Sequence, residues 1–251
     1  QLITSQLDVD RLDYLKRDSF FTGVSEGSVN TQRIISMMNV KDDELLIDEK
    51  GVYSIENFLT ARMFMYWQVY YHKTSALAEH LLVKILSRAK QLISEGKQVE
   101  AYGNLKYFLY KTDFEKATEE DVNRFTQLDD TDVLSAIKTW QNADDFVLSY
   151  FCKAVVQRKF PKTVFSSQKF EESEILEKIE RANQKFGIEN GDQLVEQISR
   201  TLLPYDNQKQ PIFLLKRDGR KIKLEDAETQ ILSAHINQPT TKNILFFPRE
   251  I

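Results

Sequence analysis

The sequence is poor in glycine and proline, with only 8 and 5 of these residues among 251. Average usage would place the two together near roughly 12%, and so few chain breakers favour long helices. The glycines form no dinucleotide-binding fingerprint, and no Lys-Ser or Lys-Thr pair follows them in phosphate-loop spacing. These absences exclude Rossmann-type and kinase-type nucleotide sites and predict a mostly α fold.

The chain has a single cysteine, Cys152, which excludes an internal disulfide and a cysteine-ligated zinc site. Because Cys152 lies in an apolar helical pattern over 146–156, we expect a buried structural thiol and a reducing compartment. No apolar run approaches the roughly 18 residues of a membrane span, and no signal peptide opens the chain. We therefore expect a cytoplasmic protein without a membrane partner.

Charge is nearly balanced, with 34 Lys and Arg against 38 Asp and Glu, giving a net charge of -4. Whole-molecule attraction to nucleic acid is not predicted, so any anion site must be local. The 41% hydrophobic content excludes disorder. The chain begins at Gln1 without a methionine, and helical spacing of apolar residues starts almost at once, so we expect a fragment of a longer protein.

Apolar periodicity predicts a helical body followed by a smaller lobe. In the body we expect a hairpin around 45–53, a long helix over 54–94 that is interrupted near 72–74, and further helices over 5–18, 31–38, 98–111, 119–127, 131–142 and 144–158. In the tail we expect a strand at 163–165, helices over 171–186 and 191–199, and a small sheet from 211–215, 220–224 and 244–247. The predicted domains are therefore a helical body, 1–162, and an α+β lobe with a short antiparallel sheet, 163–251.

Two predicted helices carry polar stripes with a spacing of four residues, which places their members on one helix face. The stripes consist of Asp10, Tyr14 and Asp18 and of Arg62, Tyr66 and Tyr70. Together they offer carboxylates for a metal or a sugar hydroxyl, a guanidinium for phosphate, and aromatic faces for a base or ribose. Judged by spacing alone, a solvated face with partly buried tyrosines is the commoner interpretation of such stripes.

The three histidines do not suggest a metal site or a nucleophilic relay. His72 and His80 are eight residues apart, which separates them by about 80° around a helix, and His235 is distant in the tail. Each is interpreted as a hydrogen-bonded or surface residue.

Several segments resemble one known family. Residues 5–18, SQLDVDRLDYLKRD, followed by FTGV at 21–24, closely resemble the last motif of HD-domain deoxynucleoside triphosphate triphosphohydrolases. The helix from Arg62 to Lys73 resembles theirs more loosely, VQRKFPKTV at 156–164 resembles their arginine-to-lysine turn, and FFPRE at 246–250 resembles the end of the Gram-positive members. The resemblance implies that this chain is the later half of an HD-domain helical body plus the α+β lobe.

The resemblance also implies an activity and site residues. Family members release triphosphate and a deoxynucleoside, using a divalent metal such as Mg or Mn held by a histidine, a His-Asp pair and a final aspartate. By resemblance that aspartate is Asp10; no His-Asp dipeptide occurs in the sequence, so the chain alone is expected to be inactive. The substrate residues implied are Arg11 and Arg62 for the triphosphate, Tyr14 and Asp18 for the deoxyribose, and Tyr66 and Tyr70 for the sugar pocket.

Family members are commonly tetramers with activating nucleotides at subunit interfaces, so the resemblance implies a homo-oligomer that binds deoxynucleoside triphosphates. The matching basic positions are Arg33, Lys50, Lys73, Arg158 and Lys162. An ordinary basic surface is the alternative for these residues. For the whole chain, the alternative function is a non-catalytic nucleotide-sensing or oligomerisation module.

Overall fold

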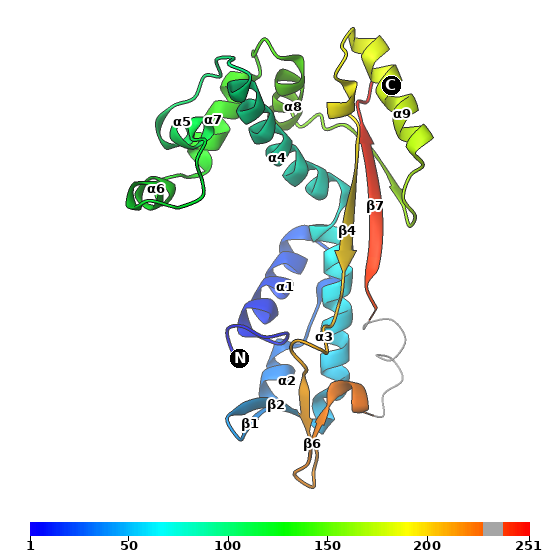
Figure 1. The fold of residues 1–251 in the computed structure, drawn as a ribbon. Coiled ribbons are helices and arrows are strands. Elements are labelled where there is room, and N and C mark those ends of the chain that lie inside the picture. The colour runs from blue at the N-terminus through cyan, green and yellow to red at the C-terminus, as the bar shows by residue number, and fades with distance from the viewer. Residues whose placement is uncertain (228–237) are drawn as a thin grey trace. The chain divides into compact units, whose positions relative to one another are not determined.

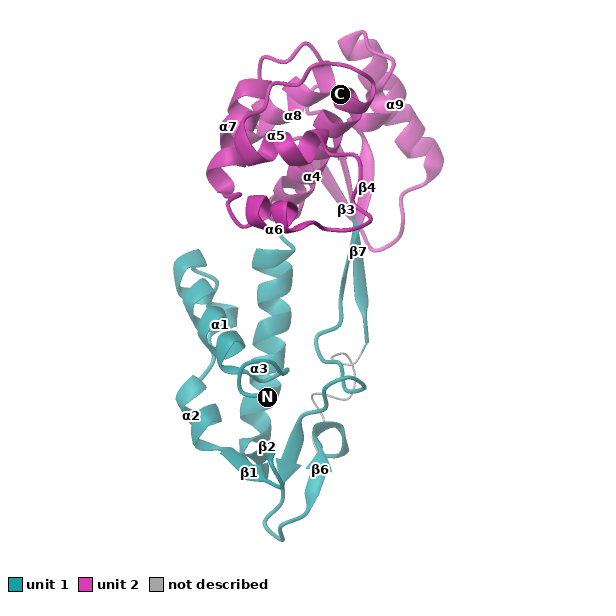
Figure 2. Ribbon diagram, turned by 60° about the vertical axis from the view of Figure 1, so that its left-hand side comes forward, with its two compact units in different colours: residues 1–72, 199–243 teal, residues 73–198, 244–251 magenta. Residues whose placement is uncertain are grey.

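The computed structural model describes residues 1–227 and 238–251, and it divides the chain into two compact units. Unit 1 comprises residues 1–72 and 199–243, and unit 2 comprises 73–198 and 244–251 (Figure 2). The units therefore divide the chain at other points than residue 163, and the two domains expected from the sequence stay a prediction. His235 lies outside the described residues.

Unit 1 is built around three helices and a four-stranded sheet (Figure 1). Its elements are α1 (Val9–Thr22), η1 (Ser25–Gly27), α2 (Thr31–Ser36), β1 (Met38–Lys41), β2 (Glu44–Asp48), η2 (Glu49–Gly51), α3 (Val52–Met65), the π-helix η3 (Tyr66–Tyr70), β5 (Phe213–Leu215), β6 (Lys221–Lys223) and η5 (Leu224–Asp226). The sheet order is β1-β2-β5-β6, with β2 and β5 parallel and the outer pairs antiparallel.

The core of unit 1 joins its early helices to the tail segment. Leu15 of α1 and Phe58 of α3 are fully buried in the same cluster as Tyr205 and Leu214, which are about 140 residues or more away in sequence. Gly27 lets η1 approach α3 closely, because a Cβ at residue 27 would lie 2.5 Å from the Sδ atom of Met65 in α3. Packing between distant segments therefore holds α1 and α3 in place.

Unit 2 is mainly helical. Its helices are α4 (Lys73–Ser94), α5 (Gly103–Tyr110), α6 (Glu119–Phe125), α7 (Asp130–Trp140), α8 (Phe146–Val156), α9 (Glu172–Phe186) and η4 (Gly191–Gln193). A second sheet has the order β3-β7-β4, with bounds Lys162–Ser166, Thr240–Phe247 and Glu196–Leu202; β4 and β7 have residues in both units.

The mostly α fold class is confirmed, since helices α1 to α9 dominate the described residues. The break in the long helix is also confirmed: the backbone N–H of Tyr71 donates to the carbonyl of Tyr66, and α4 starts at Lys73. Cys152 is fully buried in the core of unit 2, and burial raises the pKa of its thiol to about 12. No described helix is long and apolar enough to cross a membrane.

Three local predictions were wrong. The first hairpin turns at Asp42 and Asp43, whose φ values are 52° and 61°, and not within the predicted 45–53. Short acidic side chains tolerate the left-handed conformation that tight hairpins need. The region predicted as a helix over 191–199 is the short η4 followed by strand β4, because pairing in a sheet overrides weak helical periodicity.

The third error concerns the tail sheet. The hairpin of β5 and β6 formed as predicted, but β7 joins β3 and β4 instead of that hairpin. The fold therefore has two small sheets, and the first is mixed because β2 and β5 are parallel.

Candidate functional site

The two polar stripes meet in unit 1, on α1 and on α3 with its π-helical end. Asp8 caps α1 by accepting a hydrogen bond from the Arg11 N–H at 2.8 Å, so the helix begins at Val9 rather than at Ser5. The π-helix places Tyr66 and Tyr70 with their ring centroids 5.1 Å apart. Single π-helical turns are frequent at functional sites, so η3 is a candidate part of such a site.

Tyr70 connects the two stripes. Its hydroxyl donates a hydrogen bond to Asp18 Oδ2 at 2.7 Å, and its ring meets that of Tyr14 edge to face at a centroid distance of 5.9 Å. Burial, followed by this hydrogen bond, raises the pKa of Tyr70 well above its usual range. Burial also raises the pKa of Tyr14, and the neighbouring Tyr66 adds to the increase. Both phenols are therefore neutral hydrogen-bond donors at physiological pH.

Arg62 supplies the positive charge beside these rings. It is buried, its guanidinium lies 5.5 Å from the centroid of the Tyr66 ring, and Nη1 donates to the carbonyl of Pro204 at 3.2 Å. Within the described residues, Arg62 Nε is buried without a hydrogen-bond partner. A buried donor left unpaired costs about 1–3 kcal/mol, so a ligand oxygen that reached it would be stabilised.

Arg11 and Asp10 are adjacent on α1 but differ in their contacts. The guanidinium of Arg11 contacts the Asp8 carboxylate and the carbonyl of Ser5, so this arginine is committed to the start of its own helix. Asp10 is exposed in the first turn. Among residues 1–227 and 238–251, no group of three or more His, Cys, Asp or Glu side chains is placed to hold a metal ion. Asp10 is therefore not part of such a group within these residues.

The five basic residues of the expected regulatory site are all exposed and are divided between the units. Arg33 lies in α2 and Lys50 in η2 of unit 1. In unit 2, Lys73 begins α4, Arg158 follows α8 with a φ of 54°, and Lys162 begins β3. Lys162 Nζ lies 5.6 Å from the centroid of the Phe247 ring. The joint regulatory role of these residues stays a prediction.

Two of the buried polar residues that were missed from the sequence, Asp8 and Gln6, lie next to this site. Asp8 precedes the first apolar residues of α1, which is the usual place of an N-cap, and that signal was available. The role of Gln6 could not be predicted from the sequence, because its partners are about 200 residues away. Its side chain donates to the carbonyls of Asp206 and Gln210 at 2.6 and 2.7 Å and accepts from the Asp206 N–H at 3.0 Å. It fixes the loop that follows Pro204, the partner of Arg62.

Part of the chain matches a known protein family, and other proteins are similar to it in sequence. Residues 29–108 match the model of the HD associated region. The chain is 33% identical over 257 residues to the uncharacterized protein YwfO of Bacillus subtilis, covering all of this chain and 57% of that protein. It is 29% identical over 96 residues to the deoxynucleoside triphosphate triphosphohydrolase SAMHD1 homolog of Dictyostelium discoideum, covering 38% of this chain and 18% of that protein.

Among solved structures, a phosphohydrolase from Bacteroides thetaiotaomicron has a similar fold. The TM-score is 0.89 at 39% sequence identity, and the match covers 99% of this chain and 63% of that chain. A hypothetical protein from Aquifex aeolicus gives a TM-score of 0.66 at 28% identity, with 99% of this chain and 56% of that chain covered. The chain thus spans a little over half the length of the relatives that it matches from end to end.

Proposed function

We propose that this chain, whose matches support a phosphohydrolase of the HD superfamily, forms part of a metal-dependent enzyme that cleaves deoxynucleoside triphosphates to deoxynucleoside and triphosphate. The observation that carries the proposal is the hydrogen bond from Tyr70 to Asp18 beside the buried Arg62. This cluster combines an acceptor for a sugar hydroxyl with a cation for phosphate. The site therefore suits a phosphorylated sugar.

In this proposal the tyrosines and Asp18 bind the sugar. Tyr70 holds one oxygen of Asp18, which leaves the other to accept a hydrogen bond from the 3′-hydroxyl of a deoxyribose. The neutral phenol of Tyr14 donates from the same face, and Tyr66 lines the pocket. The ring of Tyr70 excludes a 2′-hydroxyl by its bulk, which gives selectivity for deoxyribose over ribose.

The arginines bind the triphosphate. Arg62 is held over Tyr66 and has an unpaired Nε, so it meets a phosphate oxygen with little reorganisation. Arg11 contacts phosphate only after it leaves Asp8, so we propose that the substrate competes with that carboxylate. The product triphosphate carries high negative charge, and two guanidinium groups would stabilise it as it leaves.

The described residues do not by themselves fit a divalent metal, because they contain no group of three or more side chains that could hold one. In the proposal, Asp10 completes a ligand set whose other members come from outside these 251 residues.

We also propose that the complete protein is a homo-oligomer. An activating nucleotide would bind at its subunit interfaces, because exposed cations suit a triphosphate. The cations proposed for this role are Arg33, Lys50, Lys73, Arg158 and Lys162.

A non-catalytic nucleotide-sensing or oligomerisation module is the second candidate. It is favoured by one finding: the matched family model describes a region associated with HD domains, and it lies over 29–108, beyond the motif of Asp10. A module of this kind would bind nucleotide through the tyrosine and arginine stripes without hydrolysing it.

The test has two parts. The chain is first heated with excess dGTP or GTP in magnesium buffer, because a ligand that binds the native state alone raises the melting temperature. The complete protein encoded by the gene is then assayed for release of triphosphate, as distinct from single phosphate, with Arg62→Ala as the site variant and Arg17→Ala, an exposed position on α1, as its control.

The proposal predicts a rise selective for dGTP, and triphosphate release that Arg62→Ala abolishes and Arg17→Ala preserves. Binding without any hydrolysis by the complete protein would favour the sensing module. The proposal is overturned if the chain shows no rise in melting temperature selective for dGTP and the complete protein releases no triphosphate.

A further inference from the structure

Tyr71 follows the π-helix η3 and takes no direct part in the proposed binding of nucleotide. Its side chain is half-buried and contacts two other aromatic rings edge to face. The ring centroid of Tyr71 lies 5.3 Å from that of Tyr66 and 5.6 Å from that of Trp67. Both contacts use the ring of Tyr71 and not its hydroxyl, so a phenylalanine at this position would preserve them.

The π turn explains how Tyr71 reaches Tyr66. The backbone N–H of Tyr71 donates to the carbonyl of Tyr66 at 2.6 Å, a hydrogen bond that spans five residues. In an α-helix, residues five apart are separated by about 140° around the axis, so Tyr71 would point away from Tyr66. The wider π turn keeps Tyr70 beside Tyr66 and adds Tyr71 as a second neighbour.

A further contact anchors Tyr71 through Trp67. The ammonium of Lys242 lies 4.2 Å from the centroid of the Trp67 ring, a distance at which a cation is attracted to an indole. Lys242 lies in strand β7 and belongs to unit 1, as does the π-helix, so this contact joins Trp67 to a segment distant in sequence. Tyr71 therefore contacts an anchored ring as well as Tyr66.

Tyr66 in turn supports Arg62. The Arg62 guanidinium lies 5.5 Å from the centroid of the Tyr66 ring, and Arg62 Nη1 donates to the carbonyl of Pro204 at 3.2 Å. One hydrogen bond leaves the plane of a guanidinium free to turn about that bond, so the ring of Tyr66 supplies a second constraint. The direction of the buried, unpaired Arg62 Nε therefore depends on where the Tyr66 ring lies.

We infer that Tyr71 is a positioning residue for Arg62 and acts through Tyr66. Tyr71 prevents the Tyr66 ring from turning away, and that ring keeps the guanidinium plane of Arg62 in one orientation. Arg62 Nε is then preset for an oxygen of a bound phosphate, which lowers the entropy cost of binding. The positioning follows from ring contacts alone, whereas its effect on nucleotide affinity rests on the proposed function.

The first test needs no nucleotide. The Arg62 Nε–H signal of the whole chain is observed by heteronuclear NMR and is assigned by its loss in Arg62→Lys. An aromatic ring shifts the signal of a nearby proton, and the size of the shift reports where the ring lies. Tyr66→Leu gives the signal without the ring. We expect Tyr71→Ala to move the Arg62 signal towards that of Tyr66→Leu, and Tyr71→Phe to leave it unchanged.

The second test measures the affinity for dGTP by titration calorimetry. Loss of one aromatic pair changes an equilibrium constant by about twofold to tenfold, so Tyr71→Ala should lower the affinity by about that factor. Tyr71→Phe should bind dGTP as tightly as the natural chain, because it keeps both ring contacts. Rescue by phenylalanine would assign the effect to the ring of Tyr71.

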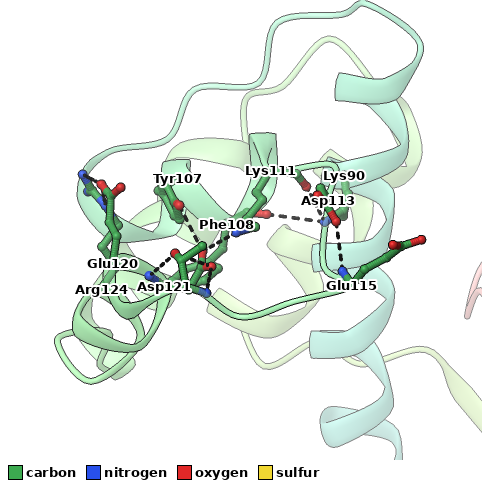
Figure 3. Close-up of polar contacts among 10 residues, drawn as sticks. Lys90, Tyr107, Phe108, Lys111, Asp113, Glu115, Glu120, Asp121 and Arg124 are labelled. Carbon is green, nitrogen blue, oxygen red and sulfur yellow. Dashed lines mark hydrogen bonds and ion pairs between the residues drawn. The ribbon is translucent and has the colours of Figure 1, made fainter.

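Tyr107→Ala is the matched control, because Tyr107 has a similar environment in unit 2 (Figure 3). Its ring centroid lies 4.5 Å from the guanidinium carbon of Arg124, its ring meets that of Phe108 edge to face, and its hydroxyl donates to Asp121 at 3.0 Å. Tyr107→Ala removes comparable contacts in the other unit, so it should change neither the Arg62 signal nor the affinity. Circular dichroism checks that each variant is folded.

The inference is overturned if Tyr71→Ala leaves the Arg62 signal at its position in the natural chain. It is also overturned if the natural chain binds dGTP and Tyr71→Ala binds it equally tightly. A natural chain that does not bind dGTP, combined with a moved Arg62 signal in Tyr71→Ala, would count against the proposed function and support the positioning role of Tyr71.

Discussion

The hydroxyl of Tyr70 donates a hydrogen bond to Asp18 at 2.7 Å, joining the π-helix after α3 to the last turns of α1. These residues are 52 positions apart in sequence. The bond uses one of the two carboxylate oxygens of Asp18, and the Tyr70 ring also lies against that of Tyr14. Both features enter the proposed recognition of deoxyribose, and they can be separated by mutation.

Tyr70→Phe removes the hydrogen bond and keeps the ring. A hydrogen bond to a charged group contributes about 1.5–3 kcal/mol, so we expect the affinity for dGTP to fall by about tenfold or more. The preference for dGTP over GTP should persist, because the ring still excludes a 2′-hydroxyl. Titration calorimetry of the variant with each nucleotide measures both quantities.

Tyr70→Ala removes the ring as well and should abolish that preference. Tyr53→Phe is the control, because Tyr53 is an exposed tyrosine of α3. An unchanged dGTP-over-GTP preference in Tyr70→Ala would refute the steric role of Tyr70.

The buried side chain of Gln6 is expected to determine the stability of the loop after Pro204. Gln6→Leu removes the three hydrogen bonds that the buried Gln6 side chain forms with residues 206 and 210. An intramolecular hydrogen bond contributes about 0.5–1.5 kcal/mol, so the melting temperature should fall by several degrees. Thermal unfolding measures this, and hydrogen exchange should show faster exchange in the loop.

Gln208→Leu is the matched control, because Gln208 is an exposed glutamine of the same loop. Equal melting temperatures for the two variants would mean that Gln6 does not hold the loop.

Glu196 at the start of β4 predicts an acid dependence of stability. Its hydrogen bond with His80, followed by that with Lys84, lowers the pKa of this carboxyl from its ordinary value of 4.5 to about 2. Because the folded-state pKa is depressed, the stabilisation is complete above pH 4.5 and is lost as the pH falls towards 2. The natural chain should therefore be more stable than Glu196→Gln at pH 7, and the difference should shrink below pH 4.5.

Chemical denaturation of both proteins at a series of pH values measures this difference. Glu189→Gln, at an exposed position of the same unit, should show no such convergence. A constant difference between the natural chain and Glu196→Gln from pH 7 down to 3 would contradict the assigned cause.

The two polar stripes were accessible from the sequence because each is local, whereas the roles of their residues were implied by the family resemblance and stay a prediction. A spacing of four residues placed Asp18 on the face of Tyr14, and Tyr70 on that of Tyr66, and the structure brings both pairs together. The contact from Arg62 to Pro204 was not accessible, because it joins segments 142 residues apart that share no pattern. Likewise, local periodicity in 191–199 indicated a helix, and pairing with β7 made part of it a strand.

Substitution of Asp10 distinguishes a catalytic role of this residue from a structural one. Its carboxylate is exposed in the first turn of α1, where no described residue pairs with it, so Asp10→Asn should change the melting temperature of the chain very little. In the complete protein, loss of a metal ligand should lower triphosphate release by at least 100-fold, since second-shell changes alone cost about 10–100-fold. The control is Asp13→Asn, another exposed aspartate of α1, paired with Arg17. If Asp10→Asn keeps full activity, Asp10 is not a ligand of the metal.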